Sequence, residues 1–214
     1  MEAFDDDIVP VISDQRSPDS TKVGAWLFRH RTALPLPIAF ALLLLRTGES
    51  AFSWTLIGLG VVLTAAGEAL RVWAVHHIGA ISRTRSGRLG PLVESGPFSW
   101  IRNPLYVGNI LLWFGFALSA RLVWMAPLIV ALLALEYHAI VAWEERLLDS
   151  RYGPEYRAYA SRVPRWVPAL SGHDAPPAGA ERAAFSWRET LFSERGTLIA
   201  IAAAYGLLWI KARF

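Results

Sequence analysis

One long apolar stretch constrains this chain more than any other feature. Between Leu105 and Trp143 the only Asp, Glu, Lys or Arg residues are Arg121 and Glu136. A helix needs about 20 mostly apolar residues to cross a bilayer, so this stretch is long enough for a pair of crossings. The turn between them, Ser119-Ala120-Arg121, is very short. The sequence therefore predicts an integral membrane protein with an antiparallel helical hairpin at its centre.

Apolar segments elsewhere extend this prediction. Of the 214 residues, 54% are hydrophobic and 18% are charged, whereas roughly 25% are charged in an ordinary soluble domain. Five hydrophobic segments are expected, at residues 33–46, 51–76, 104–120, 122–143 and 196–211. The first and last are short and could lie in the interface or re-enter instead. We therefore expect an all-α, polytopic helical membrane protein with about five transmembrane helices.

Positive charges indicate the orientation. Sixteen of the 21 Lys and Arg residues lie in the N-terminal arm, in loop 77–103 and in stretch 144–195, and four lie near the opposite segment ends. Because Lys and Arg in short loops favour the cytosol, these three parts are expected there. Nineteen of the 21 are Arg, a bias associated with GC-rich bacterial genomes, so the expected location is a bacterial inner membrane.

The expected organisation follows the segments. An N-terminal cytosolic or interfacial arm (1–32) precedes a membrane core (33–170). Residues 171–195 begin with a Pro/Gly/Ala-rich run that predicts a linker and interfacial segment, before a C-terminal transmembrane helix at 196–214.

Several enzyme and site types are excluded. The chain has no cysteine, which excludes disulfides, Cys-ligated zinc, iron–sulfur clusters and thiol nucleophiles. Its five His residues are too few for the repeated clusters of membrane di-iron enzymes, and His76-His77 at a membrane boundary is more typical of a polar edge than of metal ligands. No metal site is expected. Gly58-Leu59-Gly60 lies in an apolar helix with no strand before it, so it indicates helix packing, not nucleotide binding.

Two polar motifs begin and end the central hairpin. Arg102, Asn103 and Tyr106 stand where the helix 104–120 begins, at a terminus that favours a carboxylate or phosphate. Glu144 and Glu145 stand where the returning helix ends. An interfacial anchor and a solvated helix end are the structural alternatives. Because both motifs bound one hairpin, they must lie on the same membrane face, where paired carboxylates and an Arg could hold a zwitterion.

Two further groups carry polar or aromatic side chains. Tyr156 and Tyr159 are three residues apart and share one face of a short helix that follows the turn at 152–155 and ends at Val163-Pro164. That face could lie against the membrane or cover a ligand. Glu68 and Arg71 are likewise three apart within a hydrophobic segment, where charges of opposite sign usually pair; the pair is either structural or functional.

These residues in this order resemble the isoprenylcysteine carboxyl methyltransferase and phospholipid N-methyltransferase superfamily of integral membrane methyltransferases. The resemblance rests on R-N-P-x-Y-x-G, a hydrophobic hairpin, E-E, Y-G-x-E-Y-x-x-Y and V-P-x-x-x-P, and it covers about residues 67–168. It implies that S-adenosylmethionine is the cofactor, held in a cytosol-facing C-terminal region of the membrane core. The implied cofactor-binding residues are Arg102, Asn103, Pro104, Tyr106, Gly108, Glu144 and Glu145, of which Arg102 and Glu145 are the catalytic candidates.

The sequence departs from the family at two positions. Many prenylcysteine enzymes have His in place of Asn103, and family members often have an Arg shortly before the paired acids, where residues 138–143 have none. The second departure argues against a prenylcysteine carboxylate as the substrate.

The expected reaction is methyl transfer to a lipid-like or isoprenoid acceptor, with membrane lipids as partners and no nucleic acid. The protein must align the acceptor, the methyl group and the sulfur, and exclude water. For an amine acceptor Glu145 is a candidate base. The alternatives are an NADPH-dependent sterol-type membrane reductase of related fold and a non-enzymatic membrane scaffold or assembly factor.

Overall fold

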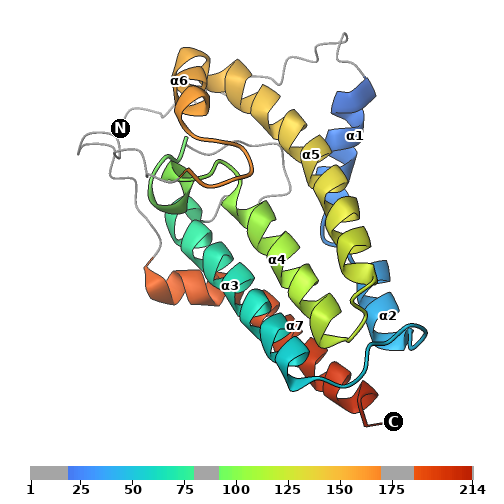
Figure 1. Cartoon of the computed structure of the whole chain (residues 1–214). Helices are drawn as coiled ribbons and strands as arrows, with labels where there is room; N and C mark the ends of the chain where they lie inside the picture. Colours follow the sequence, from blue (N-terminus) through green and yellow to red (C-terminus); the bar gives the residue numbers. More distant parts are fainter. Residues whose placement is uncertain (1–18, 80–91, 170–185, 214) are drawn as a thin grey trace, which may run out of the picture.

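The computed structural model describes residues 19–79, 92–169 and 186–213, and every regular element in these ranges is helical. The predicted all-α fold is confirmed for this part of the chain (Figure 1). The elements are α1 (Asp19–His30), α2 (Leu36–Leu44), α3 (Trp54–Ile78), the 3-10 helix η2 (Gly96–Ser99), α4 (Pro104–Ser119), α5 (Met125–Tyr152), α6 (Pro154–Arg162) and α7 (Trp187–Lys211).

Three of the described helices, α3, α5 and α7, are long and apolar enough to cross a membrane. Helix α4 is apolar but has 16 residues, which rise about 24 Å. Helix α2 has nine residues and rises about 14 Å, well short of the hydrocarbon thickness. The first predicted segment, 33–46, therefore forms a shorter helix than expected. Pro35 and Pro37 confine the helix start to this point, because proline is tolerated only in a first turn.

Small residues hold α3 and α4 together. A Cβ added to Gly60 would lie 2.6 Å from the Gly115 carbonyl oxygen, and one added to Gly67 would lie 2.5 Å from that of Gly108. Backbones this close leave no room for side chains at the contact. The prediction that Gly58-Leu59-Gly60 is a packing motif is confirmed for Gly60, whereas a Cβ at Gly58 would meet nothing within 4 Å.

The predicted antiparallel hairpin is confirmed as α4 and α5, which run side by side in opposite directions (Figure 1). Arg121 in the connection has a φ of 62°, in the left-handed region, which lets the chain reverse within a few residues. Helix α1 packs along the other side of α5. Its Phe28 ring lies 5.0 Å from that of Trp143, and Gly24 lies against the Ala139 carbonyl.

Helix α7 begins nine residues before the predicted segment 196–211. Its first turn has a complete capping box, in which the Ser186 side chain accepts from the Glu189 amide and the Glu189 carboxylate accepts from the Ser186 amide. Residues 187–195, predicted as part of an interfacial stretch, are therefore helical. Residues 170–185 lie outside the described part. Helix α7 crosses behind α3 and α4 and reaches α2 near its end (Figure 1).

Candidate cofactor site

The N-terminal end of α4 forms one wall of the candidate site. Asn103 is the residue before the helix, and Pro104 occupies the first turn, where the missing N–H costs nothing. The Asn103 side chain does not cap the helix. It donates instead to the Arg165 carbonyl at 3.1 Å, and the Arg102 amide donates to the Pro164 carbonyl at 2.9 Å. The segment after α6 is thus fastened against the start of α4.

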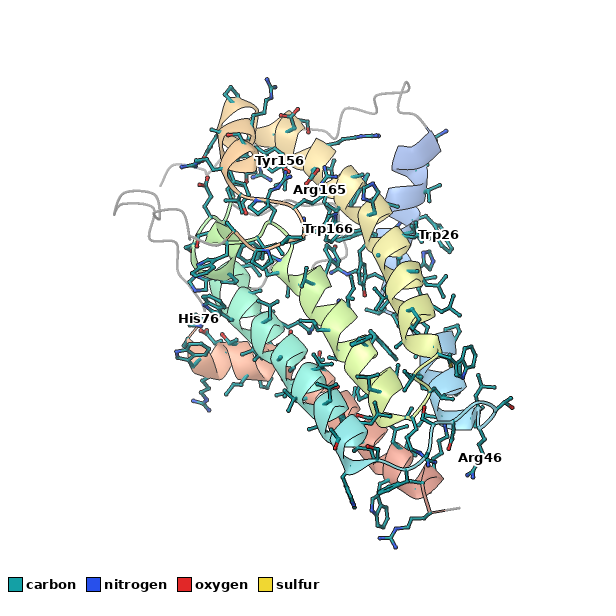
Figure 2. All side chains as sticks on the ribbon, in the orientation of Figure 1. Trp26, Arg46, His76, Tyr156, Arg165 and Trp166 are labelled. Carbon is teal, nitrogen blue, oxygen red and sulfur yellow. The ribbon has the colours of Figure 1, made fainter. Side chains whose placement is uncertain are left out.

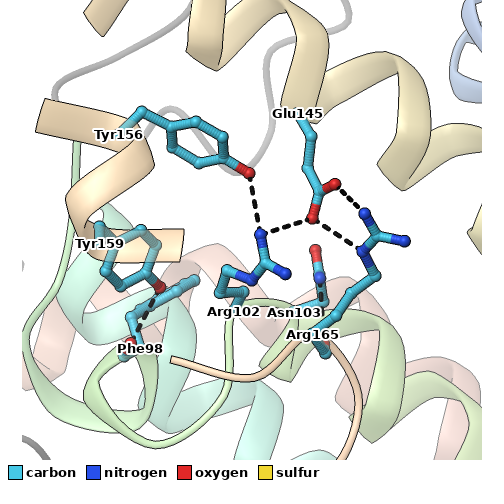
Figure 3. A network of polar contacts seen from close by, with 7 residues as sticks. All are labelled: Phe98, Arg102, Asn103, Glu145, Tyr156, Tyr159 and Arg165. Carbon is cyan, nitrogen blue, oxygen red and sulfur yellow. Dashed lines mark hydrogen bonds and ion pairs between the residues drawn. The ribbon is translucent and has the colours of Figure 1, made fainter. Parts of the chain in front are cut away.

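Glu145 joins the two arginines of this region (Figure 3). One carboxylate oxygen lies 3.0 Å from Nη1 of Arg102 and accepts from Nε of Arg165 at 2.9 Å, and the other oxygen accepts from Nη2 of Arg165. The Arg165 contact is therefore bidentate, the strongest geometry for this pair. The Nε of Arg102 is buried and has no hydrogen-bond partner among the described residues.

Glu144 lies beside this network with a different partner. The Tyr106 hydroxyl donates to the Glu144 carboxylate at 3.0 Å, and the Tyr106 ring lies against the Tyr137 ring, tilted by 32°, with 4.8 Å between centroids. Both glutamates line the cavity described below, so neither is simply a solvated helix end. The carboxylate of Glu144 is left with lone pairs that a ligand can use, because a carboxylate accepts at about four positions.

Helix α6 covers this network with aromatic side chains. Gly153 begins the turn before the helix with a φ of 48°, and the prediction of a short helix after this turn is confirmed. The Tyr159 hydroxyl donates to the Phe98 carbonyl at 2.9 Å, and the Tyr156 hydroxyl accepts from Arg102 at 3.3 Å (Figure 3). Burial, with a smaller contribution from the Glu145 charge, raises the pKa of Tyr156 to about 12. Its hydroxyl is therefore protonated at neutral pH and remains a donor.

These walls enclose a cavity of about 840 Å³. This volume lies within the range of about 300–1,000 Å³ that is usual for small-molecule sites. Its polar end is formed by α4, α5 and α6, and its apolar end by α2, α4 and α7. Of the seven residues that the sequence nominated, six line it: Arg102, Asn103, Pro104, Tyr106, Glu144 and Glu145.

Gly108 is the exception. A Cβ at this position would lie 2.7 Å from both the Arg71 Cγ and the Gly67 carbonyl oxygen, so Gly108 serves the contact between α4 and α3. His76 and His77 have separate partners: the His76 ring stacks on Trp187 at 4.0 Å, and the His77 Nδ1 lies 3.0 Å from the Ser95 hydroxyl. Among the described residues no group of three or more His, Cys, Asp or Glu is arranged to hold a metal ion.

Arg165 is the main site residue that the sequence did not nominate. It stands in the V-P-x-x-x-P motif, and the labelled side chains of Arg165 and Tyr156 lie near one another above α4 (Figure 2). The only sequence signal for it was an Arg inside a motif of the resembling family. Its contact with Glu145 depends on how the chain returns after α6.

The sequence is similar to members of a known protein family. Residues 55–155 match the family model described as phospholipid methyltransferase. The chain is 32% identical over 158 residues to the nickel-cobalt-cadmium resistance protein NccN of Alcaligenes xylosoxydans xylosoxydans and 33% identical over 159 residues to the cobalt-zinc-cadmium resistance protein CzcN of Cupriavidus metallidurans. These alignments cover 70% of NccN with 70% of this chain, and 70% of CzcN with 71% of this chain.

A more distant relative carries an enzyme name. The protein-S-isoprenylcysteine O-methyltransferase of Mus musculus is 26% identical over 175 residues, which are 76% of this chain and 60% of the mouse protein. The matched region contains both motifs of the hairpin, the start of α4 and the paired glutamates at the end of α5. The chain therefore belongs to the family of integral membrane methyltransferases that includes the phospholipid and isoprenylcysteine enzymes.

Proposed function

We propose that this protein transfers a methyl group from S-adenosylmethionine to a lipid-like or prenylated acceptor at the cytosolic face of the membrane. The observation that carries this proposal is the single cavity that joins Arg102 and Asn103 at the start of α4 to Glu144 and Glu145 at the end of α5. Groups of both charge signs face one space in a membrane helix bundle, as a zwitterionic ligand requires.

The donor set fits S-adenosylmethionine. Its amino group would be held by Glu144, whose carboxylate also accepts a hydrogen bond from the Tyr106 hydroxyl. Its carboxylate would be held by Arg102, whose Nε is a buried donor without a partner among the described residues, and by the amide groups at the start of α4. A buried unpaired donor is costly in a folded protein, so a ligand that accepts from it gains binding energy.

Methyl transfer from a sulfonium requires no metal, because the positive sulfur already activates the methyl group. The residues of this chain bind and align the reactants and exclude water. Glu145 holds Arg102 and Arg165 in place, and Tyr156 and Tyr159 cover the polar end. For an acceptor that must lose a proton, Glu145 stays the base that the sequence nominated, with the adjacent Glu144 carboxylate facing the same cavity.

The names of the relatives concern what those proteins act on or protect against, and they give no information about the cofactor site. NccN and CzcN are named for metal resistance, and the mouse enzyme for isoprenylcysteine. In this proposal the polar end of the cavity holds the zwitterionic cofactor, and the acceptor occupies the apolar end of the same cavity.

Cofactor binding tests the proposal. The purified full chain in detergent is expected to bind S-adenosylmethionine and S-adenosylhomocysteine, and to do so more tightly than NADPH. Isothermal calorimetry measures all three on one preparation, with a thermal melt to show that the fold is intact. Binding of NADPH with no response to either adenosyl compound would support the reductase alternative, and a response to none of the three would support the scaffold.

The membrane topology is the second part of the proposal: five crossings, the first of them made by α1 and the short helix α2 together, with the N-terminus inside and the site on the cytosolic face of a bacterial inner membrane. Arg46, Arg121 and Lys211, expected on the opposite side, gather at one end of the bundle, where Lys211 lies 3.0 Å from Glu49. Arg46 is labelled there, far from Tyr156 and Arg165 (Figure 2).

Cysteine labelling in intact cells checks this topology. The chain has no native cysteine, so single cysteines report cleanly. Cysteines at Ser86 and Ser171 are expected to be shielded from an impermeant thiol reagent, and one at Ser50 is expected to react. Permeabilised cells supply the control, in which all three should react. The reverse pattern in intact cells would overturn the orientation.

A further inference from the structure

A second polar cluster lies in the same cavity, apart from the paired glutamates. Its centre is Arg71 of α3, whose Nε donates to Glu68 at 3.1 Å and whose Nη2 donates to Glu194 of α7 at 2.6 Å. Its other terminal nitrogen donates to Asn109 of α4, and Nη2 also lies 3.4 Å from the Thr197 hydroxyl. The predicted pairing of Glu68 with Arg71 is thus confirmed, and α7 adds a second carboxylate.

This cluster faces the cavity from the side of α3, α4 and α7. Arg71, Asn109, Glu194 and Thr197 all line it, together with the neighbouring Gly196. A Cβ at Gly196 would meet nothing within 4 Å, so this part of the α7 wall leaves open space. The proposed cofactor residues line the same cavity, as does Tyr137, whose ring lies 4.8 Å from the Tyr106 ring between centroids. A ligand at the cluster would therefore share one space with the bound cofactor.

Much of the remaining lining of the cavity is apolar. This apolar part includes aliphatic and aromatic side chains of α2, α4 and α7, namely Ala39, Leu42, Leu112, Phe116, Ala204 and Leu208. An apolar lining beside a buried polar cluster fits a molecule with one polar head and a hydrocarbon chain, because the apolar side chains can pack against the chain while the polar groups bind the head. The cluster is then the place for the head.

The charges of the cluster select the kind of head. The Arg71 guanidinium donates to four partners from the five N–H groups it has, so little of it is left for an anionic ligand. Two carboxylates, those of Glu68 and Glu194, accept hydrogen bonds from this one guanidinium, and the Glu194 carboxylate is the one that lines the cavity. A carboxylate or phosphate head would be repelled here, whereas a head with N–H or O–H donors would be stabilised.

We propose that Arg71, Asn109 and Glu194 form the subsite for the head of the methyl acceptor, and that α7 through Glu194 and Thr197 selects a hydrogen-bond-donating head over an anionic one. This inference rests on the proposed function. Helix α7 lies outside residues 55–155, the part that matches the family model, so the model does not include the residues proposed to select the head.

The subsite also accounts for the acceptor's chemistry. The nitrogen or oxygen of the head uses a lone pair to form a bond to the methyl carbon, and the carbon–sulfur bond breaks with its electron pair going to sulfur. The sulfonium becomes a neutral thioether, and the proton displaced from the head passes to a carboxylate of the cavity. Glu194 is a positioning residue in this scheme, because it holds the head through its donors.

A series of ligands with one chain and different heads tests the subsite. Hexadecylamine, hexadecanol and palmitate are titrated into the detergent-solubilised full chain, with binding followed by tryptophan fluorescence because Trp113 and Trp143 line the cavity. The amine is expected to bind at least about tenfold more tightly than palmitate, as charge-assisted hydrogen bonds require. In Glu194→Gln the affinity for the amine is expected to fall about tenfold and that for palmitate to stay or rise.

Two matched variants keep the test decisive. Arg195→Gln changes the neighbouring exposed residue, whose guanidinium lies over the Phe192 ring, and is expected to leave the head preference unchanged. Thr197→Val keeps the side-chain volume and is expected to weaken amine binding about fivefold. If Glu194→Gln does not fold, this second variant tests the subsite in its place.

The affinity for S-adenosylhomocysteine distinguishes a failure of the proposed function from a failure of the proposed subsite. It is expected to be the same in wild type, Thr197→Val and Glu194→Gln. Wild-type protein that binds no adenosyl compound would refute the proposed function. Adenosyl binding together with equal affinities for the three heads, or with an unchanged preference in both α7 variants, would refute the subsite alone.

Discussion

Replacing Glu144 by Gln is expected to raise the dissociation constant of S-adenosylhomocysteine about ten- to a hundredfold, since a lost charge-assisted hydrogen bond costs about 1.5–3 kcal/mol. The fold should survive, because the amide oxygen of Gln can still accept the hydrogen bond that Tyr106 donates at 3.0 Å. Arg102→Ala is expected to give a loss of similar size. The measurement is calorimetry of S-adenosylhomocysteine binding, with a thermal melt of each variant.

Glu145→Gln should behave differently from Glu144→Gln. Its carboxylate joins Arg102 to Arg165, so its loss also releases the segment after α6 and lowers the melting temperature together with the affinity. Asp149→Asn is the control on the same helix, because its ion pair with Arg157 is largely exposed and contributes at most about 1 kcal/mol. Wild-type affinity in Glu144→Gln, Glu145→Gln and Arg102→Ala would remove these residues from the site and leave only a likeness of fold.

The sequence could predict that the two site motifs lie close together, because this follows from a single helical hairpin. A stretch with two charges between Leu105 and Trp143 must fold as a hairpin, and the residues at its ends must then meet. The structure has Arg102 and Glu145 in an ion pair of 3.0 Å. The short helix α6 was predictable for the same reason, since a Gly and a Pro at its start are local signals.

Contacts that depend on the return of a distant segment could not be predicted. Arg165 reaches Glu145 only because residues 164–169 pass back along the start of α4, where the Ala169 amide donates to the Trp100 carbonyl. The ion pair between Arg71 of α3 and Glu194 of α7 joins two residues that are 123 positions apart in the sequence. Gly108 stood in a motif assigned to the cofactor, but its environment is set by α3, which no periodicity on α4 reveals.

The start of α7 was predictable in principle and was missed. Hydropathy alone begins the segment at residue 196, because Arg188, Glu189, Glu194 and Arg195 make the preceding turns polar. The capping box of Ser186 and Glu189 marks the true beginning. These polar turns have one buried side and one exposed side. Glu194 is buried and pairs with Arg71, whereas Arg195 is exposed. A charged residue in a membrane helix is accommodated when it faces a partner in the bundle.

The close contact of α3 with α4 gives the largest expected effect on stability. Gly67→Ala is expected to lower the free energy of unfolding by about 1–3 kcal/mol, the usual cost of overpacking. The added Cβ would lie 2.5 Å from the Gly108 carbonyl oxygen and 2.8 Å from the Leu112 amide nitrogen, and both are backbone atoms that cannot rotate away. A thermal melt in detergent, followed by circular dichroism, measures the change.

Gly58→Ala is the matched control, on the same helix and nine residues earlier. Nothing lies within 4 Å of a Cβ there, so the variant should be neutral, or more stable by up to about 1 kcal/mol because Ala favours a helix over Gly. The distance between the two helices also sets the cavity, since Arg71 packs directly on Gly108. Gly67→Ala should therefore weaken binding of the hexadecyl ligands as well as the fold. Equal melting temperatures for the two variants would show that α3 and α4 are not packed as closely as these glycines require.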